Sequence, residues 1–288
     1  MERLETKKGS IPEPLRIVSV SGGKDSTALY LWAIEQWGKN GFLAVFADTG
    51  NEHPVTLNYL RNLPDMAGGP PIVWTTARLA DKVRSKGKEP SGNPFLDMIL
   101  WNGRTPSAKA QFCTEYLKLR PIADWLENIQ GNKEPIMYTG IRAGESVRRS
   151  KMAEREWSKF YDCYTERPLL KWTESQVFDY LKSKGVPPNP LYEAGFVRVG
   201  CFPCIHARKA DLARLPDWAW DKIESWEKAS GRSWFRPNCI PGLPPHQWPT
   251  TQQMREWSKT SRGGVQYDML APDAADVPTC MSTWGTCE

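Results

Sequence analysis

Short apolar runs rich in β-branched and aromatic residues alternate with amphipathic stretches through the first half of the chain. The apolar runs predict strands and the amphipathic stretches predict helices. The strands are expected over residues 16–20, 43–46, 72–74 and 136–140, and the helices over 25–37, 54–62, 95–101 and 114–129. Such alternation predicts an α/β fold, an open and mostly parallel sheet with helices on both faces.

The second half of the chain changes character. From Arg167 a short extended segment is expected, followed by a helix with Thr173 as its N-cap and Gln176 three residues later. Beyond about residue 215 the sequence is rich in Trp and Pro, with short helical pieces over 218–228 and 252–257. We therefore expect a nucleotide-binding domain over residues 10–215 and a smaller, mainly helical or irregular C-terminal appendage over 216–288.

A phosphate-binding loop is predicted between the end of the first strand and the start of the helix that follows it. Its residues read SGGKDS and begin at Ser21. Gly22 and Gly23 allow a tight turn that aims backbone N–H groups at an anion, and the start of the helix adds partial positive charge. The charge of Lys24 and the hydroxyl groups of nearby side chains can contribute further contacts. These hydroxyls belong to Ser21, Ser26 and Thr27. The spacing matches neither GxxxxGK[ST] nor GxGxxG, so the loop is of another kind.

Polar segments also follow the second and fourth predicted strands, at Asp48-Thr-Gly50 and Gly140-Ile-Arg142. Ligands of open parallel sheets bind beyond the carboxyl ends of the strands, so these segments and the SGGKDS loop should meet at one crevice. Arg142 suits bidentate contact with a phosphate. Asp48 is either a ligand of a metal ion or adenosine, or a simple turn residue. Asp25 either holds a metal ion or fixes the loop.

Composition narrows the class of protein. A net charge of +5 and a pI near 8.8 fit partners that carry phosphate without demanding a long nucleic acid. No run of about 18 apolar residues predicts a membrane span, and the start MERLETKKGS has no apolar signal region, so we expect a cytoplasmic protein. In a reducing cytosol the seven cysteines favour metal binding or reactive thiols over disulfides. The fourteen tryptophans are expected mainly to pack in the core.

Two of the cysteines, Cys201 and Cys204, form a CxxC motif after Gly200. This spacing lets both thiolates reach one metal ion. The pair precedes no suitable βαβ unit, which argues against a redox motif of the thioredoxin type.

Six segments in fixed order resemble the phosphoadenylyl sulfate reductase branch of the PP-loop, or adenine nucleotide alpha hydrolase, superfamily. They span about residues 15–210 and read SGGKDS, FADTGNEHP, FCTEYLKLRPI, GIRAGES, RPLLKWTESQVFDYL and NPLYEAGFVRVGCFPC. The resemblance implies a Rossmann-like fold that binds an adenine nucleotide. It also extends to ATP sulfurylase small subunits and to sulfur-inserting proteins of DNA phosphorothioation.

The resemblance implies ATP, with Mg²⁺, as the nucleotide. Members of the superfamily split ATP between the α and β phosphates, whereas the reductases usually carry a degenerate first loop; here Lys24, Asp25 and Ser26 are intact. The candidate catalytic residues are Lys24, Asp25 and Asp48. The candidate nucleotide-binding residues are Ser21, Gly22, Gly23, Lys24, Asp25, Ser26, Thr27, Asp48, Gly140 and Arg142.

The resemblance also implies a 4Fe-4S cluster. Cys113 stands where reductases with a cluster have two adjacent cysteines, the first of which is Phe112 here. Together with Cys201 and Cys204 this gives three thiolates, and Cys239 is the first choice for the fourth, with Cys280 and Cys287 as rivals. A cluster held by three cysteines and a zinc ion held by four are the alternatives.

Three functions follow. The leading hypothesis is an enzyme that splits ATP to activate an acceptor for sulfur transfer, and a tRNA base, a DNA phosphate and a small sulfur compound are all open as acceptor. The second is a sulfonucleotide reductase that releases sulfite, although the chain ends Gly285-Thr-Cys-Glu288 in place of the Glu-Cys-Gly of reductase tails. The third is a nucleotide-sensing or nucleic-acid-binding module without turnover, held together by zinc.

Overall fold

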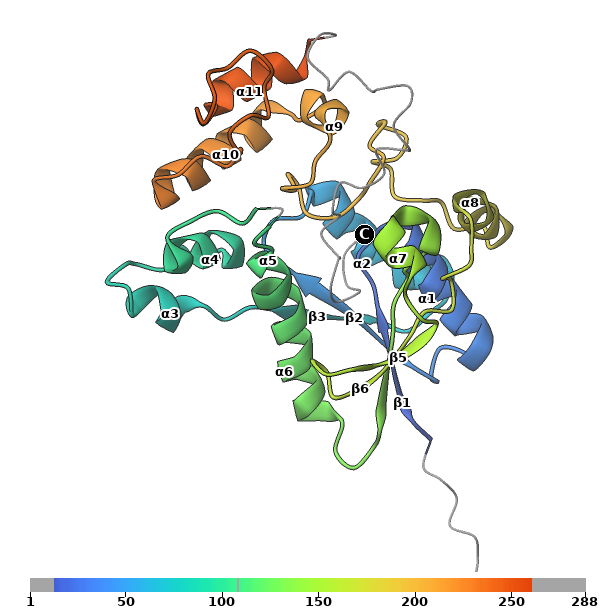
Figure 1. Cartoon of the computed structure of the whole chain (residues 1–288). Helices are drawn as coiled ribbons and strands as arrows, with labels where there is room; N and C mark the ends of the chain where they lie inside the picture. Colours follow the sequence, from blue (N-terminus) through green and yellow to red (C-terminus); the bar gives the residue numbers. More distant parts are fainter. Residues whose placement is uncertain (1–12, 108, 261–288) are drawn as a thin grey trace, which may run out of the picture.

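The computed structural model describes residues 13–107 and 109–260 of the chain. At its centre lies a six-stranded sheet with the strand order β3-β2-β1-β4-β6-β5 (Figure 1). Neighbouring strands are parallel, except that β5 and β6 are antiparallel. The strands are β1 (Leu15–Ser19), β2 (Leu43–Asp48), β3 (Ile72–Thr76), β4 (Pro135–Tyr138), β5 (Arg155–Ser158) and β6 (Cys163–Glu166).

Helices connect the strands and form the region after the sheet. They are α1 (Lys24–Trp37), α2 (Pro54–Ala67), α3 (Ala80–Arg84), α4 (Pro94–Asn102), α5 (Phe112–Thr114), α6 (Arg120–Ile129), α7 (Val147–Ser150), α8 (Glu174–Ser183), α9 (Lys209–Ala213), α10 (Asp217–Ser230) and α11 (Thr251–Ser258). A π-helical turn, η1 (Glu115–Leu119), joins α5 to α6, and a 3₁₀ turn, η2 (Ala143–Glu145), precedes α7.

Both faces of the sheet are covered, as the sequence predicts. On β1 the side chain of Val18 packs with α1, α2 and α8, whereas its neighbour Ile17 packs with α6 on the opposite face. Phe46 and Val45 divide in the same way on β2. Successive side chains of a strand point to opposite faces, so a strand buried on both sides reads as a continuous apolar run. The α/β fold class is confirmed.

The register of the sheet decides where the functional segments meet. Ile17 of β1 is aligned with Leu43 of β2 and with Met137 of β4. The carboxyl ends of these three parallel strands therefore lie at one edge of the sheet. The loops that follow them, over residues 20–23, 49–53 and 139–142, surround this edge.

The predicted strands and the helices around the loop are found, with boundaries shifted by a few residues. The helix expected over 114–129 is instead three consecutive pieces, with η1 between α5 and α6. The capping box of α8 is confirmed, because Thr173 Oγ1 accepts a hydrogen bond from Gln176 N and the Gln176 side chain accepts one from Thr173 N.

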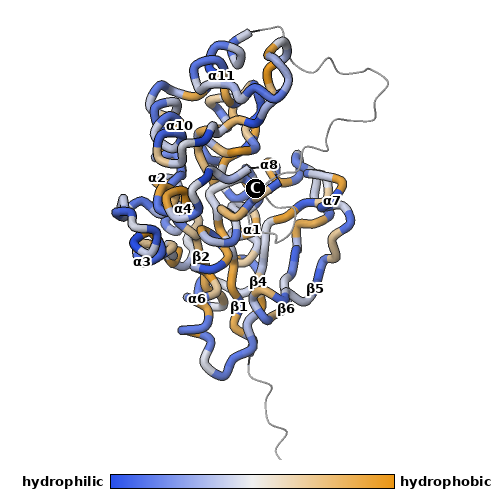
Figure 2. The backbone as a smooth tube through the Cα atoms, turned by 60° about the vertical axis from the view of Figure 1, so that its left-hand side comes forward, coloured by the Kyte–Doolittle hydropathy of each residue, from blue (hydrophilic) through white to orange (hydrophobic). Residues whose placement is uncertain are grey.

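The prediction of an extended segment from Arg167 is wrong. The chain turns there, with Leu170 N donating to Arg167 O, because Leu169 and Leu170 are buried in different apolar clusters. The hairpin of β5 and β6 just before it was not predicted. Its strands are only four residues long, and β5 is largely hydrophilic, as Figure 2 shows at the edge of the sheet.

Residues 216–260 pack on the segment between β3 and α6. One apolar cluster joins Phe95 and Met98 of α4 to Trp220 and Trp226 of α10 and Met254 of α11. In Figure 1, α10 and α11 lie beyond the carboxyl edge of the sheet, on the side of α4. Trp220 and Trp226 are buried, which confirms the expectation that tryptophans here serve packing. Among the described helices, none is long and apolar enough to span a bilayer.

Candidate functional site

The SGGKDS loop forms a tight turn between β1 and α1. Gly22 has a φ of +82°, and a Cβ atom on it would lie 2.8 Å from Thr56 Cγ2, so the position requires glycine on both counts. Gly23 is the N-cap of α1 and provides no side chain to cap the first turn. The loop therefore presents backbone at the positive end of a 14-residue helix, which suits an anion.

The hydroxyl groups predicted to contact phosphate also shape the loop itself. Ser26 Oγ accepts from Ser21 N at 3.1 Å and lies 3.0 Å from Ser21 Oγ. Ser26 Oγ and Thr27 Oγ1 both donate to Gly23 O, at 3.1 and 2.9 Å. The turn is therefore fixed before any nucleotide binds, and contact with phosphate stays a prediction for these three side chains.

Asp25 fixes the loop to the end of β4. Its carboxylate is fully buried and forms an ion pair with Arg142 Nε. At Gly140, just before Arg142, a Cβ atom would lie 2.8 Å from Asp25 O, so the two segments touch backbone to backbone. The ion pair with Arg142 anchors the loop, and a role of Asp25 toward a metal ion stays a prediction. Gly140 and Arg142, predicted to approach the nucleotide, lie directly against the loop.

Lys24 stands in a network of charges. Its Nζ atom lies 3.4 Å from Asp25 Oδ2 and 3.4 Å from Glu174 Oε1 at the start of α8. Its backbone N–H donates to the hydroxyl of Tyr192 at 2.9 Å. Glu174 is 57% exposed, so it is the weakly held partner of this lysine.

Arg142 is braced from its other side by Glu145. The carboxylate of Glu145 accepts from Arg142 N at 2.8 Å and pairs with the buried Arg149. Burial opposes the charge of Arg142, but the carboxylates of Asp25 and Glu145 raise its pKa overall. Arg142 therefore stays charged at the crevice. Arg149 is a structural cation, whereas Arg148 is exposed.

Asp48, at the end of β2, makes a turn. Its Oδ1 atom accepts from Gly50 N at 2.9 Å, and Gly50 O accepts from Asn93 Nδ2 at 2.8 Å. This is the simple reading of a turn aspartate. Asp48 is only partly buried, and its role toward a metal ion or adenosine stays a prediction.

Glu52 is a residue that sequence reasoning missed. Its buried carboxylate accepts hydrogen bonds from Thr49 N, Thr49 Oγ1 and Asn51 N at 3.1, 2.6 and 3.2 Å. Burial raises its pKa to about 7 in spite of these donors. Glu52 lines a cavity of about 20 Å³ together with Ser21, Lys118 and Cys201. A buried acid thus lies between the SGGKDS loop and the CxxC motif.

The CxxC motif lies against the loop after β2. Cys201 and Glu52 form an antiparallel bridge, Phe202 N donates to Asn51 O, and Asn51 Nδ2 donates to Pro203 O at 3.0 Å. These bonds attach the cysteine loop to the nucleotide crevice. Cys201 and the SGGKDS loop are far apart in sequence, and the fold brings both to one cavity.

Of the four cysteines predicted to bind a metal, only two line the same cavity. Cys201 and Cys204 line one cavity, whereas Cys239 Sγ lies 3.5 Å from Met254 Sδ in the C-terminal cluster and Cys113 packs at the edge of the same cluster. Within residues 13–107 and 109–260, no group of three or more His, Cys, Asp or Glu side chains is arranged to hold a metal ion. Their ligand role stays a prediction. Cys280 and Cys287 lie outside the described residues.

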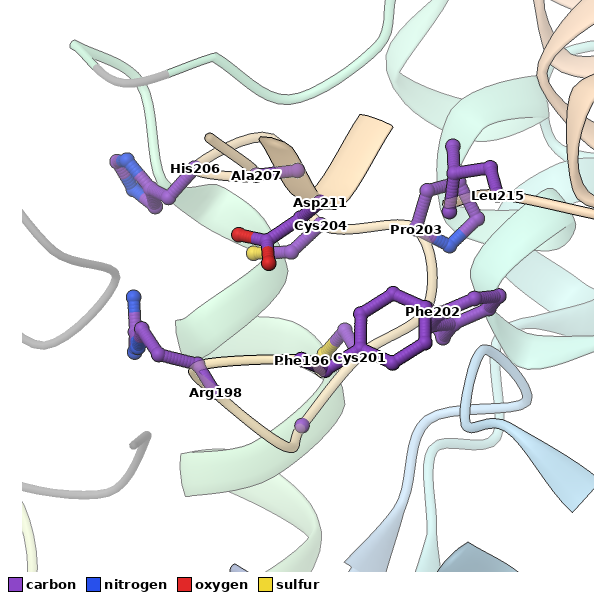
Figure 3. Close-up of a pocket in the computed structure, with 11 residues that line it drawn as sticks. Phe196, Arg198, Cys201, Phe202, Pro203, Cys204, His206, Ala207, Asp211 and Leu215 are labelled. Atoms are coloured by element: carbon purple, nitrogen blue, oxygen red, sulfur yellow. The ribbon is translucent and has the colours of Figure 1, made fainter. Parts of the chain in front are cut away.

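Figure 3 shows the cavity of about 50 Å³ beside the CxxC motif. His206 and Asp211 line it. Within the described part of the chain, the two ring nitrogens of His206 and Asp211 Oδ1 have no hydrogen-bond partner. Burial, reinforced by the charge of Arg198, lowers the pKa of His206 to about 4. The imidazole is therefore neutral, which is the form that binds metals.

Three further residues belong to the site although the sequence did not single them out. Lys118, on the π-helical turn η1, lines the cavity of Glu52, and π-helical turns often mark functional sites. Asn189 Nδ2 donates to Gly22 O at 3.1 Å, and Tyr192 contacts Lys24. The only signal available was that each lies inside a segment that carries the family resemblance.

Comparison with known proteins gives the family. A model of the phosphoadenosine phosphosulfate reductase domain matches residues 16–207, about two thirds of the chain. An uncharacterized 37.8 kDa protein of Escherichia phage 186 is 34% identical over 329 aligned positions, which cover 95% of this chain and 97% of the relative. The adenosine 5'-phosphosulfate reductase of Allochromatium vinosum is 31% identical over 128 residues, or 44% of this chain and 48% of that enzyme.

The alignment with this chain therefore covers about half the length of that reductase. Among solved structures, phosphoadenylyl-sulfate reductase from Candida auris in a phosphate complex is 17% identical, with a TM-score of 0.47 over 68% of this chain and 85% of that one. That likeness adds no argument of its own. The domain match covers the loop, the two other strand ends and the CxxC motif, and so the chain belongs to the phosphoadenosine phosphosulfate reductase domain family.

Proposed function

We propose that this protein binds ATP at the SGGKDS loop and splits it between the α and β phosphates, thereby activating an acceptor for sulfur transfer. The observation that carries the proposal is the loop itself, which is intact in sequence and ordered by its own hydrogen bonds at the start of α1. A reductase of adenylyl sulfate has no need of such a loop, because it breaks no bond between phosphates.

The pyrophosphate part of ATP is held by backbone and by cations. The first turn of α1 supplies N–H groups and the positive end of the helix dipole. Lys24 exchanges its exposed partner Glu174 for a phosphate oxygen, while Asp25 keeps Arg142 in place beside it. Fixed charges of this kind stabilise the negative charge that develops on the leaving group.

The bond changes are those of a displacement at phosphorus. An oxygen or sulfur of the acceptor attacks the α phosphorus, the bond from that phosphorus to the bridging oxygen breaks, and pyrophosphate leaves with the electron pair. Mg²⁺, when bound, neutralises charge on the phosphates. Asp25 is committed to Arg142, which leaves Asp48 as the carboxylate to hold the ion.

The types of donor at the CxxC motif suit a metal group. Cys201, Cys204 and His206 line one cavity, although among the described residues no three such side chains are already arranged around one point. An iron–sulfur cluster in this place would supply sulfide or electrons near the nucleotide. A zinc ion would instead stabilise the cysteine loop. The sulfur donor and the acceptor are not specified by any contact in the site.

The test is pyrophosphate release from ATP by the full-length chain purified without oxygen. Lys24→Ala should weaken ATP binding roughly 10- to 150-fold, since hydrogen bonds to charged groups contribute about 1.5–3 kcal/mol. Lys171→Ala is the matched control, because its side chain is 81% exposed and pairs with Glu154 at the surface. Equal ATP affinity of Lys24→Ala and the parent, measured by calorimetry, would refute the proposal.

A second function is favoured by the similarity to an adenosine 5'-phosphosulfate reductase. In that case the protein releases sulfite from an adenylyl sulfate in the presence of a thiol, and ATP yields no pyrophosphate. Loss of this activity in Cys287→Ser would assign the nucleophile, and unchanged activity would remove the tail mechanism. Tight ATP binding with neither product, together with salt-dependent oligonucleotide binding, would instead indicate a module without turnover.

A further inference from the structure

The cavity beside the CxxC motif holds an imidazole that the fold does not explain. His206 is only 8% exposed, yet among the residues that the structure describes neither of its ring nitrogens has a hydrogen-bond partner. Buried polar groups in proteins are nearly always hydrogen-bonded, and an exception calls for a ligand, a water or an ion. The imidazole does not cap a helix or join a network, so packing alone does not account for its position.

The chemistry of the neighbouring side chains indicates which kind of ligand. Cys201, Cys204 and His206 lie on one loop within six residues, and all three line the same cavity of about 50 Å³ (Figure 3). Two thiolates and an imidazole are donors of the kind that zinc and iron take in proteins. The loop is attached to the crevice through Asn51 and Glu52, so its backbone is fixed.

The cysteines available to complete such a site are poorly placed. Cys239 contacts the sulfur of Met254 within the C-terminal cluster and does not line the cavity. Cys113 does not line it either, and its neighbour is Phe112, where a second thiol would stand in the resemblance. Among the side chains of residues 13–107 and 109–260, the donor nearest to hand for a metal group at Cys201 and Cys204 is therefore not a cysteine.

We propose that His206 is a ligand of the metal group held by Cys201 and Cys204, in the place of a missing cysteine. This rests on the metal group of the proposed function. Since no three ligand side chains of the described residues already converge, binding turns the imidazole toward the two sulfurs.

Asp211 supports the imidazole in this arrangement. Its Oδ2 atom accepts from Arg208 N at 3.2 Å and caps α9, while Oδ1 is buried without a partner and lines the same cavity. Histidine ligands usually donate their second ring N–H to a carboxylate or carbonyl. Oδ1 of Asp211 is the unsatisfied acceptor available for that bond.

The test is the metal content and X-ray absorption spectrum of the full-length chain purified without oxygen. We expect sulfur scatterers together with at least one nitrogen in the first shell, and a loss of metal affinity of tenfold or more in His206→Ala during competition with a chelator. His246→Ala, at an exposed histidine, should match the parent. His206→Cys should recover the metal with an all-sulfur shell, which separates ligand loss from misfolding.

Two outcomes overturn the proposal: a parent protein without metal or with an all-sulfur shell, and unchanged metal content and spectrum in His206→Ala. The measured content of iron and labile sulfide, or of zinc, identifies the metal group. A histidine ligand is compatible with either. These readouts need no nucleotide. A nitrogen-containing shell in a protein that releases no pyrophosphate would refute the ATP-splitting function and leave His206 as a ligand.

Discussion

Burial assigns different roles to carboxylates that look alike in the sequence. Asp25 is fully buried against Arg142 and anchors the loop, whereas Asp48 closes a turn at the crevice edge. Glu52 is buried among backbone donors. The surroundings of each carboxylate, rather than its residue type, therefore decide whether it anchors the loop, closes a turn or has a shifted pKa.

Glu52 should make stability depend on pH. Its pKa is raised from 4.5 to about 7, so the folded protein keeps a proton that the unfolded chain loses. The stabilisation is complete below about pH 4.5, is lost as the pH rises to about 7, and is constant above that. Relative to Glu52→Gln, the parent should lose at most about 3 kcal/mol of unfolding free energy across this window.

Urea unfolding at several pH values between 5 and 8 measures this difference. Glu127→Gln makes the same chemical change at an exposed position of α6 and should run parallel to the parent. A Glu52→Gln curve that also runs parallel to the parent would show that Glu52 titrates as an ordinary surface acid.

At the scale of elements, the site depends on the close approach of the β4 end to the first turn of α1. Gly140 packs against the backbone of Asp25 and Ser26, and Arg142 follows two residues later. A glycine in this place lets the two backbones touch. The close packing of Gly140 against Asp25 also sets the distance from the Arg142 guanidinium to the SGGKDS loop.

Gly140→Ala should therefore displace the loop. The added Cβ would lie 2.8 Å from Asp25 O, a backbone atom that cannot rotate away. We expect a loss of stability of about 1–3 kcal/mol from overpacking, with weaker ATP binding. Calorimetry and urea unfolding measure both effects.

Gly144→Ala provides the comparison, because a Cβ there meets no atom within 4 Å. It should change stability by less than about 0.5 kcal/mol. If both alanine variants behave alike, the contact between β4 and α1 does not limit the site.

At the scale of the whole molecule, residues 216–260 are part of the core. Trp226 of α10 is 2% exposed and packs on Phe95 of α4, with ring centroids 4.6 Å apart, and on Trp234 at 4.8 Å. The cluster thus joins segments on both sides of residue 215. We infer that the two parts unfold together, and the division into domains at 215 and 216 stays a prediction.

Trp226→Ala should cost about 3–5 kcal/mol of unfolding free energy, as expected for removing a buried tryptophan. Trp248→Ala, at a side chain that is 57% exposed, should remain within about 0.5 kcal/mol of the parent. Urea unfolding followed by both tryptophan fluorescence and far-UV circular dichroism tests this. Separate transitions for the two probes in the parent would mean that the C-terminal region folds independently.

The sequence by itself determined the alternation of strands and helices, the loop at Gly22 and Gly23, the capping box at Thr173 and the family. These depend on local periodicity, turn chemistry and residue spacing, which a single stretch of chain carries. Tertiary structure alone decided that Asp25 pairs with Arg142, that Glu52 is buried beside Cys201, and that His206 lacks a partner. Burial and pairing depend on segments 100 or more residues away in the chain, and no local pattern encodes them.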